Sequence, residues 1–290
     1  MKVLIIGVLA AMAATIAPAA GQGQSSQPAG APAPKVRSLR SKAEQQALQA
    51  VLHATTNEAR ILAADDFVTK FPKSDFRGLA LWAEAQAYQQ KNDYVNMVVY
   101  AERVLESDPD DATKAQTMAM LALAIAQHTG EFDLDREEKL GRVEKYADGA
   151  LDILKTLPKP NASVSDEEWN SFKGQMAADA HDALGMDAMI RKNVDGAIKE
   201  FKTSIDATKA PSPSTEMRLA AAYNQAGKYD DALALCDKAL NAPNLNPQIQ
   251  RVALAERSRA MGGKGAGPKA GAPAAAAPAA AAAPAPAPKP

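Results

Sequence analysis

Apolar residues recur along most of this chain in the pattern of amphipathic helices. Residues 219–240, LAAAYNQAGKYDDALALCDKAL, are an example, because two alanine-rich runs flank a short polar segment, NQAGKY. Amphipathic runs of this length, interrupted by a glycine, are typical of two helices joined by a turn. The segment therefore predicts a helical hairpin.

The same pattern continues from about residue 39 to residue 262, with no strand-like alternation of polar and apolar positions. Pro72 and Pro109 are expected to end helices, since proline cannot continue one, and Ser165 to Glu168 form a capping box. Gly262 and Gly263 are expected to end the last helix. The predicted helices are 40–54, 57–71, 76–90, 93–107, 112–128, 136–156, 166–190, 193–208, 214–226, 229–241 and 246–261.

Three of the predicted hairpins can be aligned on their turns. The alignment places a small residue at the same position of the first helix in residues 85–105, 185–205 and 220–240. A small residue there lets the second helix approach closely. The alignment also places Tyr88 at the position of Tyr223. The turns coincide as Asn92-Asp93-Tyr94, Lys192-Asn193-Val194 and Gly227-Lys228-Tyr229; the small residues as Ala85, Gly185 and Ala220; and the second-helix positions as Met97, Ala197 and Ala232.

This pattern resembles the tetratricopeptide repeat, a helix–turn–helix unit of 34 residues. The resemblance covers most of residues 40–242, with the specific signature in the three aligned hairpins. It implies an all-α, right-handed superhelical solenoid of about five such repeats in residues 39–262, in which the helix at 246–261 caps the last repeat. Val252, Ala253 and Leu254 are expected to cover that repeat, while Arg251, Glu256, Arg257 and Arg259 stay in solvent. An irregular all-α bundle is the alternative.

In the tetratricopeptide family, the first helices of successive units line a concave groove that holds peptides or partner helices. Transferring that groove by register implies a set of partner-binding positions that is rich in methionine, which suits adaptable surfaces. The alternative is that the methionines and Trp82 pack between neighbouring helices. The predicted groove residues are Trp82, Gln86, Gln89, Gln116, Met120, Asp182, Met186, Met189, Met217, Asn224 and Gln225.

Charge is unevenly distributed along the chain. The net charge is −1, but the first 40 and last 34 residues hold nine basic residues and no acidic one. The middle therefore carries 24 basic against 34 acidic residues, a net charge of −10. An acidic body argues against a nucleic-acid partner.

The two ends of the chain differ from the middle. Lys2 followed by an apolar run from Val3 to Ala17 and an Ala17-Pro18-Ala19 site predicts a signal peptide in residues 1–20. Residues 21–38 are a linker rich in Gly, Gln and Pro, and residues 263–290 an Ala/Pro-rich tail, both expected to be disordered. The mature chain is thus expected to be exported, to be periplasmic or secreted, and to lack a transmembrane segment. Retention of the segment as an uncleaved anchor is the alternative.

The sequence contains no recognisable catalytic or metal-binding constellation. His53, His128 and His181 lie far apart, and Cys236, the single cysteine, sits in an apolar run that predicts a buried core residue. No glycine-rich phosphate loop or nucleophile elbow occurs. We therefore expect a protein that is not an enzyme and has no cofactor or metal.

Together these observations predict a scaffold or adaptor of the bacterial cell envelope that binds a partner protein or peptide in the groove. One alternative is a structural envelope protein that assembles with itself. Another is a helical enzyme or lipid-handling domain, which would need a deep apolar cavity with convergent polar groups.

Overall fold

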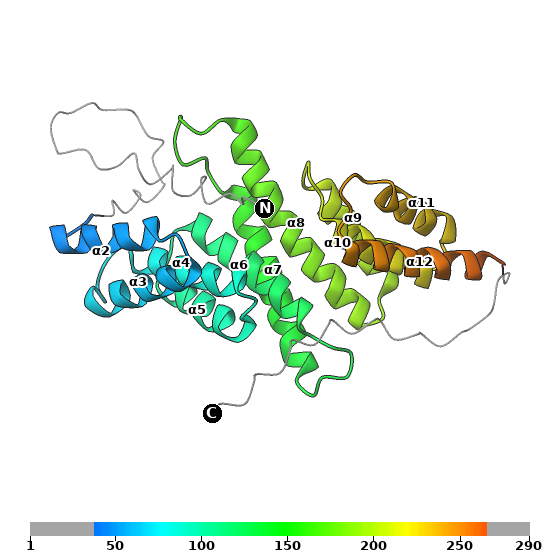
Figure 1. Ribbon diagram of the computed structural model, residues 1–290, viewed down its shortest axis with the longest axis horizontal. Coiled ribbons are helices and arrows are strands. Elements are labelled where there is room, and N and C mark those ends of the chain that lie inside the picture. The colour runs from blue at the N-terminus through cyan, green and yellow to red at the C-terminus, as the bar shows by residue number, and fades with distance from the viewer. Residues whose placement is uncertain (1–37, 266–290) are drawn as a thin grey trace. The chain divides into compact units, whose positions relative to one another are not determined.

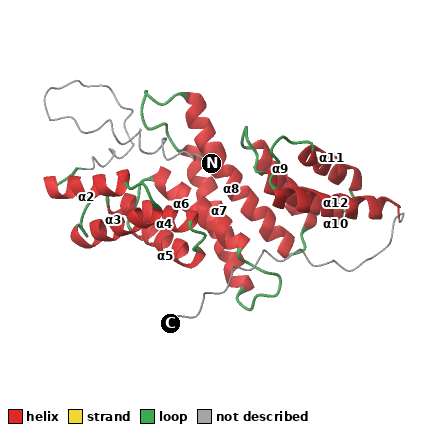
Figure 2. Ribbon diagram, in the orientation of Figure 1, coloured by secondary structure: helices red, strands yellow, loops and turns green. Residues whose placement is uncertain are grey.

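The computed structural model describes residues 38–265, which contain helices and no strand (Figures 1 and 2). The predicted helix limits agree with the observed ones to within two residues as far as Leu240. The helices are α2 (Lys42–His53), α3 (Asn57–Lys70), α4 (Arg77–Gln90), α5 (Tyr94–Glu106), α6 (Asp111–Gln127), α7 (Arg136–Thr156), α8 (Asp166–Ile190), α9 (Val194–Asp206), α10 (Pro213–Gln225), α11 (Tyr229–Leu240) and α12 (Pro247–Gly265).

Several helices begin at a side chain that accepts a hydrogen bond from a free backbone N–H group of the first turn. Asp93 Oδ1 accepts from Asn96 N at 3.2 Å, and Asn193 Oδ1 accepts from Gly196 N at 3.0 Å. The predicted capping box is present: Glu168 N donates to Ser165 Oγ at 3.1 Å, and Ser165 N donates to Glu168 Oε2 at 3.0 Å.

The three aligned hairpins turn in the same way. Asn92, Lys192 and Gly227 each have a positive φ, of 55°, 61° and 70°. One residue later, the backbone N–H reaches back to the carbonyl five residues before it, in a Schellman-type closure of the first helix. These bonds are Asp93 N to Tyr88 O (3.0 Å), Asn193 N to Ala188 O (2.8 Å) and Lys228 N to Tyr223 O (2.8 Å).

The chain divides into two compact units, with boundaries inside α6 and α8 and directly after α7. The first unit comprises residues 1–113 and 157–172, and the second unit comprises residues 114–156 and 173–290. In the part of each unit that the structure describes, consecutive hairpins pack side by side, so the predicted TPR-like, all-α fold class is confirmed. The signal peptide and most of the linker and tail lie outside the described residues.

The first unit has a core between α2, α3, α4 and α5. Val51, Phe67, Leu81 and Val104 are fully buried, one from each helix, and Leu79 and Trp82 join them. The two hairpins α2–α3 and α4–α5 thus share one apolar core, as stacked repeats do.

The second unit repeats this packing with residues of different size. Phe201 of α9 is fully buried at the position that corresponds to Cys236 in α11, and Gly185 of α8 faces it. A methyl carbon built on Gly185 would lie 2.4 Å from Phe201 Cε1, so the missing side chain makes room for the ring. The small residues Ala85 and Ala220 at the equivalent positions are also fully buried.

Between α10, α11 and α12 lies a second cluster, in which Ala220, Cys236 and Ala253 are fully buried. The prediction that Cys236 is a core residue is confirmed. Burial, its largest cause, raises the pKa of the Cys236 thiol to about 11, which keeps it protonated and unreactive.

The last helix differs from its prediction in three ways. Leu254 is 51% exposed, whereas Glu256 is 2% exposed, because the buried residues of α12 are Ala253, Glu256 and Ala260, with Val252 partly buried beside them. The buried Glu256 carboxylate is compensated by Asn224 Nδ2 at 2.9 Å and by Arg259 Nη1 at 2.6 Å.

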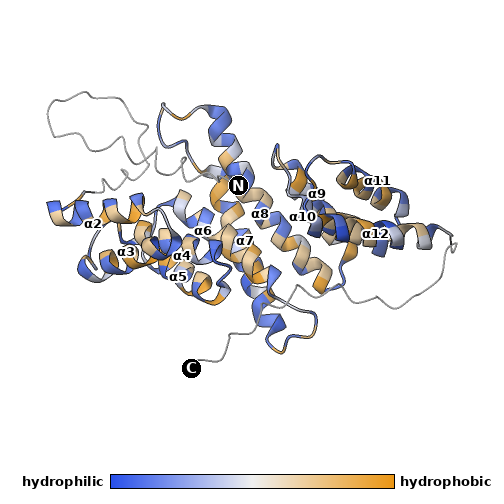
Figure 3. Cartoon of the chain, viewed as in Figure 1, coloured by the Kyte–Doolittle hydropathy of each residue, from blue (hydrophilic) through white to orange (hydrophobic). Residues whose placement is uncertain are grey.

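Gly262 and Gly263 do not end α12, which continues to Gly265. A methyl carbon on Gly263 would lie 2.3 Å from Tyr229 Cζ, so this glycine allows the helix to pack closely against the start of α11. Figure 3 shows hydrophobic residues interleaved with hydrophilic ones along α11 and α12.

The core of the first unit also holds a carboxyl group. Glu84 is fully buried, and neither of its oxygens accepts a hydrogen bond of standard geometry from the described residues. Burial, and then the charge of Asp65, raise the pKa of Glu84 to about 7, while Tyr100 and Arg103 lower it. The guanidinium of Arg103 lies 4.7 Å from the centroid of the Tyr100 ring.

We expect Gly185→Ala to destabilise the second unit by about 1–3 kcal/mol, because the added methyl group overlaps Phe201. Gly141→Ala is a matched control in α7, where a methyl group would meet nothing within 4 Å. It should stabilise the protein by about 0.5–1 kcal/mol through helix propensity. Thermal unfolding by circular dichroism, with amide exchange of residues 178–205, measures both effects. Equal stability of the two variants would contradict the packing described.

We expect Glu84→Gln to stabilise the first unit at pH 8 by about 1–3 kcal/mol relative to the wild type. Because the pKa of Glu84 is raised in the folded state, the contribution of this group to stability is fully present below pH 4.5 and is lost as the pH rises through 7. The advantage of the variant should therefore shrink towards pH 5. Urea unfolding followed by tryptophan fluorescence measures it, because Trp82 and Trp169 both belong to this unit.

Glu58→Gln is the control for that measurement. Its carboxyl is exposed, and the hydrogen bond from Lys91 lowers its pKa. This variant should gain no stability at pH 8, and a pH-independent difference for Glu84→Gln would disprove the assignment.

Candidate functional site

The predicted groove residues of the first unit lie partly inside the protein. Trp82 is 5% exposed and belongs to the core, while Gln86 is half-buried and Gln89 is exposed on the last turn of α4. The predicted contact between Trp82 and a partner would therefore require this side chain to leave the core.

The methionines of the second unit also contact neighbouring helices. Met186 and Met189 are partly buried against the cluster around Phe201, and Met217 is 2% exposed in the cluster around Cys236. On α6, Gln116 and Met120 are half-buried.

Two of the three remaining predicted groove residues lie at the end of α10. Asn224 donates to Glu256 O at 2.9 Å as well as to the carboxylate, and so ties α10 to α12, whereas Gln225 is exposed. Of the predicted set, Asp182 alone lines the cavity described next.

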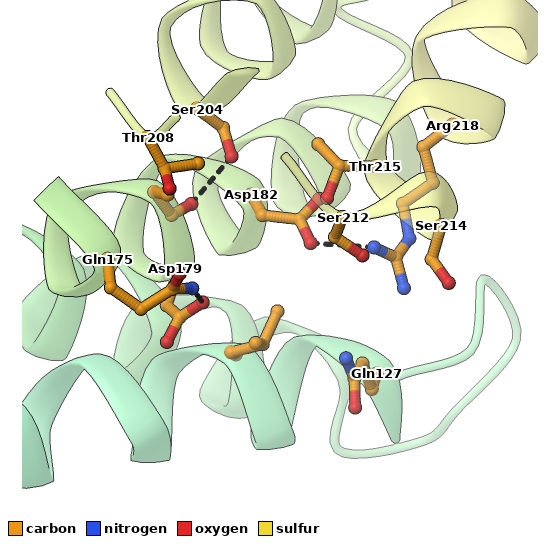
Figure 4. Close-up of a pocket in the computed structure, with 12 residues that line it drawn as sticks. Gln127, Gln175, Asp179, Asp182, Ser204, Thr208, Ser212, Ser214, Thr215 and Arg218 are labelled. Carbon is orange, nitrogen blue, oxygen red and sulfur yellow. Dashed lines mark hydrogen bonds and ion pairs between the residues drawn. The ribbon is translucent and has the colours of Figure 1, made fainter. Parts of the chain in front are cut away.

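A polar cavity of about 130 Å³ lies within the second unit, between α6, α8, α9 and α10 (Figure 4). The first helices α6, α8 and α10 contribute residues to it, together with α9 and the loop that follows α9. Its lining is Leu123, Gln127, Gln175, Ala178, Asp179, Asp182, Ser204, Thr208, Ser212, Ser214, Thr215 and Arg218.

Helical spacing brings these side chains together. On α8, positions 175, 178, 179 and 182 follow the i, i+3, i+4, i+7 pattern of a single helix face, and positions 123 and 127 do the same on α6. Pro213 in the first turn of α10 is compatible with a helix start there, and so places residues 214, 215 and 218 in the first turns of that helix.

The floor of the cavity is buried and its rim is exposed. Asp182, Ser204 and Thr215 are at most 5% exposed, whereas Gln127 and Gln175 are exposed. Ser204 Oγ donates to Ala178 O at 2.7 Å, which satisfies this hydroxyl and joins α9 to α8.

Asp182 has a buried carboxyl group whose two oxygens differ in their hydrogen bonding. Its Oδ2 accepts from Arg218 Nη1 at 2.6 Å, but its buried Oδ1 accepts no hydrogen bond of standard geometry from the described residues. Burial raises the pKa of Asp182, while Arg218 and a contact from the Thr215 hydroxyl lower it. The Thr215 contact falls short of a standard hydrogen bond, so it leaves Oδ1 without a full partner.

Asp179 lies one turn earlier on α8. Its Oδ1 accepts from Gln175 Nε2 at 3.0 Å, seen at the left of Figure 4. Burial, opposed by this hydrogen bond and reinforced by the charge of Asp182, raises the pKa of Asp179 to about 7. The cavity thus holds two carboxyl groups against one guanidinium, and that guanidinium already pairs with Asp182.

Sequence reasoning missed most of this site. Asp179, Gln175 and Arg218 were not among the predicted residues, and on α6 the cavity uses Gln127 rather than Gln116. The signal that could have found part of it is the polar face 175–179–182 of α8, which is unusual inside a helix otherwise rich in alanine.

Other chemistry is sparse in the part of the chain that the structure describes. There, no group of three or more His, Cys, Asp or Glu residues could hold a metal ion. His181 Nδ1 lies 2.7 Å from Glu200 Oε2, and His128 Nδ1 lies 2.9 Å from Ala124 O. Within residues 38–265, no helix has both the length and the apolar character needed to cross a membrane.

One exposed feature was not anticipated. The loop between α6 and α7 displays Phe132 and Leu134, which are 84% and 108% exposed. Asp133 between them accepts from Gly130 N at 3.0 Å and from Lys139 Nζ at 2.9 Å, so the loop backbone is held in place.

Comparisons with known proteins add little to this description. No protein-family model matches the chain, and no curated protein matches it. Among solved structures, a thermophilic TPR protein of Thermus thermophilus is similar, with 17% identity and a TM-score of 0.42. The match covers 75% of this chain and 99% of that one. The TPR-like description of the fold therefore depends on the three equivalent turns and the stacked hairpins of this chain itself.

Proposed function

We propose that this protein is an exported, non-enzymatic adaptor of the bacterial cell envelope. In this proposal, it binds a segment of a partner protein on the first helices α6, α8 and α10 of the second unit. Stacked helical hairpins generally provide extended surfaces for protein–protein interaction. The observation that carries the proposal is the cavity on these three helices, which has an exposed rim and a buried polar floor.

The size and lining of the cavity favour an adaptor over the enzymatic or lipid-handling alternative. Pockets for drug-sized ligands measure about 300–1,000 Å³ and are mostly apolar. This cavity has about 130 Å³, and polar or charged residues make up most of its lining. It is thus suited to a single side chain of a larger partner.

Site-specific photocrosslinking in cells tests the partner-binding face. A photoreactive amino acid at Gln127, on the rim, should crosslink to one defined segment of another protein. The same amino acid at Lys202, exposed on α9 and outside the cavity lining, should not. Equal products from both positions would contradict the proposal, and crosslinks to a second copy of this chain would instead favour self-assembly.

Export is tested by fractionating bacterial cells and measuring the mass of the mature chain. We expect a chain without about its first 20 residues in the periplasm or medium, because signal peptidases cleave after small residues such as those at Ala17 to Ala19. A variant lacking residues 1–20 should stay in the cytoplasm. An intact chain in the membrane fraction would show an uncleaved anchor instead.

A further inference from the structure

We propose that the cavity of the second unit binds the cationic head of a lysine or arginine side chain from the partner, between Asp179 and Asp182. This inference builds on the proposed function and specifies which residue type of the partner the cavity recognises. It depends on the charge balance, the partly satisfied acceptor and the dimensions of the cavity.

Charge balance favours a cation. Among the twelve lining residues, Asp179 and Asp182 are acidic and Arg218 is basic. Arg218 Nη1 lies 2.6 Å from Asp182 Oδ2, so its charge is already used. With both carboxyl groups ionised, the site has one negative charge in excess, which an ammonium or guanidinium group would neutralise.

Hydrogen bonding points to a donor. Asp182 Oδ1 is buried, as is the whole side chain at 6% exposure, and it accepts no hydrogen bond of standard geometry from the described residues. The contact from the Thr215 hydroxyl satisfies the carboxyl group only in part. A buried oxygen of this kind costs free energy until a donor reaches it. Most of the other lining side chains are amides and hydroxyls, which can accept hydrogen bonds from N–H groups and carry no charge. Arg218 is the basic side chain of the lining, and its guanidinium is paired with Asp182 Oδ2.

The dimensions fit a side-chain head. The cavity of about 130 Å³ is too small for a whole ligand of drug size, but its rim opens where Gln127 and Gln175 are exposed. The aliphatic stem of a lysine or arginine would pass this rim, while its charged head reaches the floor.

Ionisation of Asp179 would be coupled to binding. A bound cation favours the charged carboxylate and lowers a raised pKa. Asp182, on the same helix, is the charged group that acts on Asp179, and Gln175 is the hydrogen-bond donor to Asp179. Arg218 on α10 pairs with Asp182. Affinity for a cation should therefore increase as the pH rises from 6 to 8, with a proton released on binding.

The first test uses small probes. N-acetyl-arginine amide and N-acetyl-citrulline amide, which has the same shape without the charge, are titrated into isotope-labelled protein and followed by NMR. We expect the arginine compound alone to shift the amide signals of residues 175–182 and 214–218. Equal shifts from both compounds would overturn the proposal, as would shifts of the same residues by N-acetyl-aspartate amide, which would mark an anion site at Arg218.

Asp179→Asn is the test variant, and Asp195→Asn, at an exposed position in the first turn of α9, is the control with the same change in charge. Asp179→Asn should weaken arginine-amide binding by at least about tenfold and remove its pH dependence, whereas Asp195→Asn should leave both unchanged. Circular dichroism shows that each variant is folded. Equal affinities of the two variants would overturn the proposal.

A peptide selection separates this inference from the proposed function. The whole protein is used to select binders from a random peptide library. Crosslinking from Gln127 then identifies the binders that occupy the face with the cavity. Enrichment of Lys or Arg that disappears with Asp179→Asn supports the inference. Binders at the same face that show no basic preference would overturn it and leave the proposed function standing.

Discussion

Close approach between paired helices is the constraint on which the rest of this structure depends. Each aligned hairpin needs a small residue in its first helix and a residue that tolerates a positive φ in its turn. Ala85, Gly185 and Ala220 meet the first need, and Asn92, Lys192 and Gly227 meet the second. Asparagine and glycine adopt this backbone conformation readily, whereas Lys192 adopts it at a larger conformational cost. The packing of the two helices sets the turn geometry and offsets that cost.

The pairing of Gly185 with Phe201 shows how the repeats differ without losing this constraint. The equivalent second-helix positions hold the small residues Ala101 and Cys236, both fully buried. Where that position is large, in α9, the facing residue is glycine, so the helices can still approach closely. The repeats therefore have in common the combined volume of the two facing side chains, one from each helix, and not the identity of either residue.

The sequence predicted the helices and the three equivalent turns well, because both depend on local signals such as spacing, prolines and caps. It failed where a residue's surroundings come from other helices. Leu254 and Glu256 were assigned to the wrong sides of α12, since an exposed leucine and a buried glutamate contradict the usual preference. Gly263 was read as a stop, but its role is set by the ring of Tyr229, which lies far away along the chain. Most of the cavity was missed for the same reason, because the approach of α6, α8 and α10 cannot be read from any one of them.

The burial of Cys236 has a practical consequence. It is the only cysteine of the chain and is fully enclosed between α10 and α12, so its sulfur can meet a thiol reagent only when the last hairpin separates from its neighbours. The rate at which a reagent modifies this thiol under native conditions therefore measures how often that separation occurs. The dependence of the rate on urea distinguishes local opening of the last hairpin from unfolding of the whole array. Arrays of stacked units unravel from their ends when coupling between neighbours is weak, so a single sulfur atom reports how strongly the terminal unit is coupled to the rest.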